Sequence, residues 1–291
     1  MEFNSLPEDC LSYVISLTSP RDACRLALVS SFFKLASQSD TVWEKFLPSD
    51  FLQILSRSVF SIPFSSKKQL YFNLCNPVLL DGGKKIFKLE KSTSRKCYTL
   101  LARELSITWG SNPLYWTWKC PPHSQSRFSE VAELRTIWWL EIQGKIAASM
   151  LSPKTTYAAY LIVKFADRAY GLDTLPSETS IQTSSYQWRG TAYLRFGDEQ
   201  KRSLEQLYFS NRIQVLRSRV GKEEEHVPRE RSDGWMEVEL GEFFNSGVEG
   251  DVKMGLKEVK GHHLKGGLIV QGIEIRPKFS SSIVSCTNSW K

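Results

Sequence analysis

The chain has 291 residues, of which 41% are hydrophobic and 24% charged, a composition typical of a folded globular protein. This composition excludes a wholly disordered chain, and the length predicts one or two domains. No apolar run reaches the ~18 residues of a membrane-spanning helix, and the first residues do not resemble a secretory signal. Six cysteines are too sparse for a disulfide scaffold, so we expect reduced thiols and a cytoplasmic or nuclear location, or both.

The net charge of +7 is unevenly distributed along the chain. Residues 1–50 contain four basic and seven acidic side chains, a charge of −3, so the remaining residues carry +10. This change of sign indicates two units with different partners. The lysines of the basic part are scattered rather than clustered, and we therefore expect no nucleic acid as a partner. Because no apolar run is long enough to span a bilayer, we expect no membrane as a partner either.

Residues 5–50 are predicted to form three short helices. The first begins at Pro7, the second has Ser19 as its N-cap and Pro20 in its first position, and the third runs from about Thr41. Two interpretations of this segment remain open. It is either a helical subdomain packed on the rest of the chain or a unit that docks on a partner helix through an apolar stripe, namely Leu6, Leu11, Val14 and Ile15.

Four short motifs occur in order within residues 3–49: Leu6-Pro7, Asp22, Val29-Ser30 with a following Phe32, and Trp43. Together they resemble an F-box, although Ser31 stands where many F-boxes have Lys or Arg. The resemblance implies that this segment binds the Skp linker subunit, and through it a cullin ubiquitin ligase, without performing chemistry itself. It assigns contact with Skp to Leu6, Pro7, Leu11, Ile15, Val29, Phe32 and Trp43.

The hydrophobic pattern changes from helical to alternating along the chain. Residues 51–84 are predicted to form a helical linker that follows an F-box at 1–50, with Ser65 or Ser66 as the cap of a helix in it. Residues 85–279 are predicted to form an antiparallel β-sandwich, which makes the chain an α+β multidomain protein. The predicted strands include 134–143, 157–165, 236–240 and 268–275. A mobile loop at 217–233 and a flexible tail at 280–291 complete the prediction.

Motifs for phosphate cradles and for hydrolase nucleophiles are absent from the sequence. Cys120 and His123 have a C-x-x-H spacing, but no second pair completes a zinc site, so we expect no metal and no cofactor. Asp251 and Glu258 are seven residues apart in a glycine-rich region. They are open to three interpretations: acid–base work on a glycosidic bond, hydrogen bonding to sugar hydroxyls, or solvated loop charges.

Three tryptophans surround a Gly-Ser-Asn-Pro turn at 109–118, namely Trp109, Trp116 and Trp118. Such rings can stack on a sugar at the surface, or they can cap the core beside the turn, and the residues alone leave both alternatives open.

Four sequence blocks, at 102–116, 128–140, 233–244 and 259–278, resemble phloem protein 2, the family of Nictaba-type plant lectins. The resemblance implies a jelly-roll-like sandwich that binds N-acetylglucosamine oligomers or N-glycans. It assigns carbohydrate binding to Trp109, Trp116, Asp251 and Glu258, where Asp251 is one methylene shorter than the glutamate of the lectin.

With the F-box in front, the whole chain resembles the plant F-box–phloem protein 2 type B proteins. This resemblance implies a non-enzymatic subunit of an SCF (Skp–cullin–F-box) ubiquitin ligase that selects glycoproteins. The alternative is an adaptor whose sandwich binds protein targets without sugar.

Overall fold

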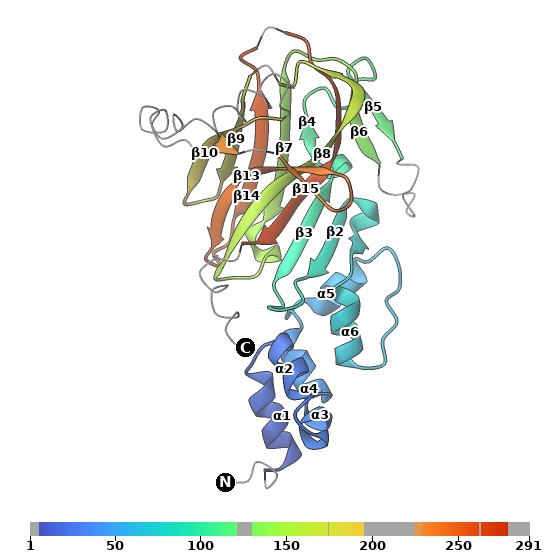
Figure 1. Ribbon diagram of the computed structural model, residues 1–291, viewed down its shortest axis with the longest axis vertical. Helices are drawn as coiled ribbons and strands as arrows, with labels where there is room; N and C mark the ends of the chain where they lie inside the picture. The colour runs from blue at the N-terminus through green and yellow to red at the C-terminus, as the bar shows by residue number, and fades with distance from the viewer. Residues whose placement is uncertain are drawn as a thin grey trace, which may run out of the picture.

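A computed structural model describes residues 6–120, 130–173, 175–194, 225–226, 228–261 and 263–278. Helices lie at the N-terminal end and two β-sheets make up the larger end of the molecule, which confirms the predicted α+β class (Figure 1). The expected tail at 280–291 and residues 217–224 and 227 of the expected loop lie outside the described residues. The described remainder of that loop contains two short strands, at Glu225–His226 and Arg229–Glu230, which the sequence did not predict.

Four short helices form the N-terminal end of the molecule. They are α1 (Glu8–Ser16), α2 (Pro20–Leu26), α3 (Ser31–Ala36) and α4 (Asp40–Phe46). The three predicted helices are present as α1, α2 and α4, with the predicted cap at Ser19, whose Oγ accepts from the Asp22 N–H at 3.1 Å. The prediction missed α3, which begins after Ser30, where the Oγ accepts from the Phe33 N–H at 3.3 Å.

Trp43 on α4 is the centre of the helical core. Its side chain is fully buried, and its Nε1–H donates to the Ser37 carbonyl at 2.7 Å. The ring packs against Tyr71 and Phe72, at centroid distances of 5.2 and 5.3 Å. Because these two rings belong to the connection that follows, the first four helices share one core with it.

The connection contains the two remaining helices, α5 (Phe51–Ser56) and α6 (Lys67–Leu74). The start of α6 is fixed by the predicted Ser66 cap, whose Oγ accepts from the Gln69 N–H at 3.1 Å, and by Asp40 of α4, whose Oδ1 accepts from the Lys67 N–H at 2.8 Å. α6 is therefore bonded directly to the helices at the N-terminal end.

The larger sheet contains nine strands within the described part of the chain. They are β1 (Val78–Leu80), β2 (Lys85–Leu89), β3 (Lys96–Leu101), β5 (Trp116–Lys119), β6 (Val131–Leu134), β8 (Thr155–Tyr170), β12 (Arg229–Glu230), β13 (Met236–Asn245) and β15 (Gly266–Pro277). The order is β1-β2-β3-β15-β8-β13-β12, while β6 also pairs with β15 and β5 pairs with β6. The sheet thus begins at Val78, before the expected sandwich boundary at 85.

The smaller sheet has six described strands in the order β11-β10-β9-β14-β7-β4. They are β4 (Ser106–Ile107), β7 (Leu140–Ala147), β9 (Ser177–Gln182), β10 (Gln187–Ala192), β11 (Glu225–His226) and β14 (Asp251–Glu258). Strands β10 and β11 are parallel, and the other described pairs are antiparallel as predicted. Three short 3-10 helices, η2 (Asp81–Gly83), η3 (Ala102–Glu104) and η4 (Ala148–Met150), lie between strands.

The strand predicted over 134–143 is divided in the structure. β6 ends at Leu134 and β7 begins at Leu140, and the segment between them pairs with β15 only through an isolated β-bridge between Ile137 and Lys265 among the described residues. The alternating pattern therefore continues in β7 but not through the segment before it. This break turns Trp138 to the surface, with 47% of its area exposed, instead of into the core with the alternating residues.

Candidate functional site

Three aromatic rings lie together at the surface of the sandwich. Trp109 is 41% exposed, and its ring lies 5.1 Å from Tyr115 and 6.0 Å from Trp138, measured between centroids. We call Trp109, Tyr115 and Trp138 the aromatic surface. Figure 1 places β4, β5 and β6, which adjoin it, at the end of the sandwich opposite the N-terminal helices.

The turn between β4 and β5 fixes the position of Trp109. Asn112 organises this turn: its N–H donates to the Trp109 carbonyl at 2.9 Å, and its Oδ1 accepts from the Leu114 N–H at 2.9 Å. Trp109 itself has a positive φ of 54°, a conformation that costs energy for a bulky residue. The fold therefore holds this exposed ring in a strained position, a feature that is common at functional sites.

Trp116 and Trp118 lie on the core side of the turn and hydrogen-bond to its backbone; they are not part of the aromatic surface. Trp116 is only 1% exposed, and its Nε1–H donates to the Thr108 carbonyl at 3.0 Å. The Trp118 Nε1–H donates to the Gly110 carbonyl at 2.8 Å, and the Arg103 guanidinium lies 3.6 Å from the centroid of the Trp118 ring. Of the two alternatives for Trp116, the geometry is that of a core residue beside the turn.

Glu258 is buried beneath the same end of the sandwich. Its carboxylate pairs with the buried Lys265 and accepts from the Gly261 N–H at 3.0 Å. Lys265 in turn donates through Nζ to the Trp138 carbonyl at 2.9 Å. Burial lowers the pKa of Lys265, and the adjacent carboxylate supplies the opposite charge that a buried cation requires. Glu258 thus holds the aromatic surface in place without reaching it.

Asp251 lies far from the other predicted sugar-binding residues. It begins β14 and Glu258 ends it, so about seven residues of strand, roughly 23 Å, separate them. An odd spacing in a strand also directs the two side chains to opposite faces of the sheet. Asp251 is exposed and pairs with Lys145 at 2.8 Å. The structure therefore does not bring the two carboxylates together, because their segment is a strand and not the loop that its glycines suggested.

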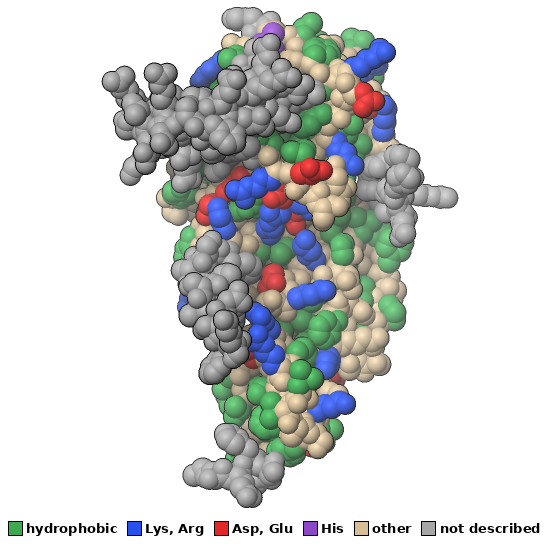
Figure 2. Space-filling model, in the orientation of Figure 1, with side chains coloured by type: hydrophobic (Ala, Val, Ile, Leu, Met, Phe, Trp, Pro, Cys, Tyr) green, Lys and Arg blue, Asp and Glu red, His purple; other side chains and the backbone are tan. Residues whose placement is uncertain are grey.

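The predicted Skp-binding residues divide into buried and exposed groups. Leu11, Ile15 and Trp43 are buried, and Phe32 is partly buried. Leu6, Pro7 and Val29 are exposed. Further exposed apolar residues of the same helices, which the assignment omitted, are Val14, Leu17, Leu28 and Leu35. Figure 2 shows hydrophobic side chains at the surface of this end of the molecule.

We define Leu6, Val14, Leu17, Leu28, Val29 and Leu35 as the helical docking face. Leu28 is the most exposed of them, at 86%. Of the stripe that the sequence suggested, Leu6 and Val14 are on this face and Leu11 and Ile15 are in the core. In a small helical unit, apolar residues at helical spacing can face either the core or a partner protein. The spacing alone therefore could not distinguish the residues that pack in the core from those that remain exposed for binding.

Comparisons with known proteins agree with this division of the chain. Residues 3–49 match the F-box-like family model, and residues 95–277 match the phloem protein 2 model. The chain belongs to the phloem protein 2 family of F-box proteins. In Arabidopsis thaliana, F-box protein PP2-B15 is 47% identical over 280 residues, covering 94% of this chain and 96% of the relative. F-box protein VBF of the same plant is 46% identical over 280 residues, covering 94% of this chain and 99% of the relative.

A mannanase structure from Podospora anserina is 10% identical, with a TM-score of 0.32, and covers 63% of this chain and 28% of its own. This similarity is too low to add to the assignment. The assignment of the chain to an F-box and a phloem protein 2 domain thus depends on the family models and the curated relatives.

The described part of the chain contains no group of three His, Cys, Asp or Glu side chains that could hold a metal ion, although His123 of the C-x-x-H spacing lies outside it. None of its helices is long and apolar enough to cross a membrane.

Proposed function

We propose that this protein is the substrate-recognition subunit of an SCF-type ubiquitin ligase. The F-box helices dock on the Skp linker and through it on the cullin, and the phloem protein 2 domain captures the target. The chain itself performs no chemistry and uses no cofactor. The observation that carries this proposal is the pairing of an F-box with a binding domain in one chain, with two exposed surfaces at opposite ends.

The helical docking face supports the first half of the proposal. Its aliphatic side chains surround a core that is already filled by Leu11, Ile15 and Trp43, so they are not needed to hold the helices together. A group of exposed apolar residues on so small a unit is typical of a protein–protein interface. Docking would remove these side chains from water, with the gain in free energy that such burial gives.

Leu28→Asp tests this half of the proposal. We expect the variant to lose binding to the Skp linker in a pull-down with the full chain, while its melting temperature stays unchanged because Leu28 is on the surface. Leu52→Asp is the matched control, since Leu52 is 66% exposed on α5, outside the F-box match. Full retention of Skp by Leu28→Asp would contradict the assignment of the docking face.

The aromatic surface supports the second half, in which the target carries N-acetylglucosamine-containing glycans. Neither Trp109 nor Trp138 donates its indole N–H to another described residue, whereas Trp116, Trp118 and Trp139 all do. Two exposed tryptophans with available donors can stack on sugar rings and hydrogen-bond to their substituents. In this arrangement Trp109 contacts the sugar directly, while Trp116 and Glu258 support it from below. Asp251 is not part of the site.

A glycan array rich in N-acetylglucosamine oligomers and N-glycans, probed with the full chain, tests this half. Trp109→Gly should abolish binding without loss of stability, because glycine accepts the positive φ of this position. Trp116→Ala should lower the free energy of unfolding by about 3–5 kcal/mol, as expected for a buried aromatic ring. Tyr186→Ala is the control, because Tyr186 is a similarly exposed aromatic residue on another loop.

A protein target without sugar is the second candidate, and one observation favours it. The carboxylate pair that the lectin resemblance implies is not assembled, since Asp251 and Glu258 lie at opposite ends of β14. A folded chain that binds no glycan on the array, and that retains an unglycosylated target, would establish this candidate and overturn the glycan assignment.

A further inference from the structure

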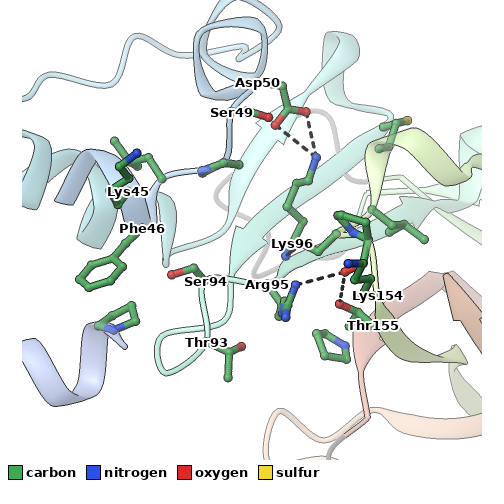
Figure 3. A pocket seen from close by; sticks show the side chains of 18 of the residues that line it. Lys45, Phe46, Ser49, Asp50, Thr93, Ser94, Arg95, Lys96, Lys154 and Thr155 are labelled. Atoms are coloured by element: carbon green, nitrogen blue, oxygen red, sulfur yellow. Dashed lines mark hydrogen bonds and ion pairs between the residues drawn. The ribbon is translucent and has the colours of Figure 1, made fainter. Parts of the chain in front are cut away.

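A cleft separates the F-box helices from the lower edge of the sandwich. Its volume is about 990 Å3, and it is lined by the α1–α2 connection, the end of α4 with the start of α5, the turns at 92–96 and 149–156, and the end of β15. Figure 3 shows Lys45 and Phe46 on the helical side and Arg95, Lys154 and Thr155 on the sandwich side. The cleft is remote from the aromatic surface, which lies at the other end of the sandwich (Figure 1).

Positive charge dominates the lining of this cleft. Its charged residues are the cations Lys45, Arg57, Arg95, Lys96, Lys154 and Lys278 and the single carboxylate Asp50. Asp50 is already paired with Lys96 at 3.0 Å. Figure 2 shows one face of the molecule, on which lysine and arginine side chains extend from the sandwich toward the helices.

Three of these cations have no carboxylate partner among the described residues. Arg57 pairs with Asp81, and Lys278 pairs with Glu239, but Lys45, Arg95 and Lys154 form no ion pair there. Within the described part of the chain, the Arg95 guanidinium donates to the Pro153 carbonyl alone, at 3.2 Å. Unneutralised cations converging on one cleft create a positive potential that attracts an anion.

The two turns that carry Arg95 and Lys154 are held in fixed conformations. In the first turn, the Glu90 carboxylate accepts from the Ser92 and Thr93 N–H groups, at 3.0 and 2.8 Å. Ser94 and Lys154 both have positive φ, at 61° and 51°, which is uncommon outside glycine. The Pro153 carbonyl accepts from both Arg95 and Thr155, which ties one turn to the other. The cations are therefore placed before any ligand arrives.

We propose that this cleft binds a phosphate monoester carried on a peptide segment. Arginine and lysine together with serine and threonine hydroxyls are the donors that suit the several oxygens and double charge of a phosphate group. Four hydroxyl-bearing residues of the lining, Ser49, Ser92, Ser149 and Thr156, donate their side-chain O–H to no described residue and so remain available to a ligand, whereas others, such as Thr18 and Thr155, already donate to backbone carbonyls. The volume is that of a site for a whole small molecule, much larger than one phosphate group, so it accommodates the residues on either side of the modified one.

A library of degenerate phosphoserine peptides on beads, with its unphosphorylated counterpart, tests the proposal on the full chain. We expect retention of the phosphorylated library alone, and competition by inorganic phosphate at millimolar concentration. Arg95→Gln combined with Lys154→Gln should weaken retention by about tenfold or more, the loss expected for charge-assisted hydrogen bonds. Lys84→Ala is the control, because Lys84 is an exposed lysine with the same charge that does not line the cleft.

Lys154→Gly separates binding from folding. Glycine accepts the φ of 51° without strain, so this variant should keep its melting temperature while it loses retention of the phosphorylated library. Lys154→Arg should retain the peptides. Equal retention by wild type and Lys154→Gly would overturn the proposal. A second outcome would also overturn the proposal: the cleft binds inorganic phosphate but shows no preference for the phosphorylated library. The bound phosphate would then not be part of a peptide.

Discussion

Glu274 on β15 is the most enclosed acid of an ionic cluster on the larger sheet. Its side chain is 4% exposed and pairs with Lys88 at 2.9 Å, Arg231 at 2.7 Å and Arg276 at 3.3 Å. Burial opposes its ionisation, but the ion pairs with Lys88 and Arg231 outweigh burial and lower the pKa of Glu274 to about 2. The folded state therefore binds a proton at this site much more weakly than the unfolded chain does.

We predict that Glu274 contributes to stability at neutral pH and that this contribution is lost in acid. A carboxyl whose pKa falls on folding stabilises the protein above its unfolded pKa, and the effect disappears as the pH falls through the folded pKa. The change from 4.5 to about 2 corresponds to roughly 3 kcal/mol at pH 7, falling steeply between about pH 4.5 and 2. Glu274→Gln should show this loss in urea unfolding at pH 7 and much less of it at pH 3.

Glu178→Gln is the control for this measurement. Its partner Lys260 also lowers the pKa of Glu178, but the pair lies at the surface, where solvent screens it. We expect little change in stability at either pH. A loss for Glu274→Gln that is the same at pH 7 and pH 3 would show that the side chain acts through packing and not through its charge.

At the level of elements, the sequence predicted those features that local chemistry determines. The caps of α2 and α6 could be read from Ser19 and Ser66, because a serine followed by a helical pattern satisfies the first free N–H groups. The turn at 109–118 followed from its glycine, asparagine and proline. β15 ends at Pro277, as expected for a residue that cannot donate to the ladder.

Features that depend on the neighbouring strand could not be predicted in this way. Trp138 carries the same alternating pattern as Leu140, yet the bridge at Ile137 turns it outward and makes it part of the aromatic surface. The lectin resemblance assigns Asp251 and Glu258 to one site, but only the strand that joins them shows that they diverge. Likewise, Leu11 and Leu28 are both apolar residues of an F-box, and only the packing of Trp43 decides which of them is buried.

A hydrogen bond joins α6 to the β2–β3 hairpin of the sandwich and leads to a prediction at the scale of elements. The Tyr71 hydroxyl donates to the Lys91 carbonyl at 3.0 Å, while its ring packs on Trp43. Tyr71→Phe keeps the ring and removes the hydrogen bond, so we expect the free energy of unfolding to fall by about 1 kcal/mol. Tyr13→Phe, at an exposed tyrosine of α1, should leave it unchanged. Equal stability of the two variants in urea titrations would contradict this role of the hydroxyl.

The whole molecule places its two exposed surfaces at opposite ends of one elongated body (Figure 1). The helical docking face lies on the F-box, and the aromatic surface lies at the opposite end of the sandwich, beside β4, β5 and β6. Helices α5 and α6 connect the two units through a shared core. If both surfaces bind as proposed, this connection determines how far a captured target is held from the docked Skp linker.

The ion pair between Asp50 and Lys96 is a second attachment between the units. Lys96 is buried on β3, and its Nζ lies 3.2 and 3.0 Å from the two Asp50 oxygens at the start of α5. Asp50→Asn leaves a buried cation without its counter-charge, so we predict a loss of about 1–3 kcal/mol and looser attachment of the F-box. Small-angle X-ray scattering should then give a larger radius of gyration than wild type. Asp167→Asn, at an exposed carboxylate of β8 without an ion pair among the described residues, should scatter like wild type. An unchanged radius for Asp50→Asn would show that α6 alone fixes the two units relative to each other.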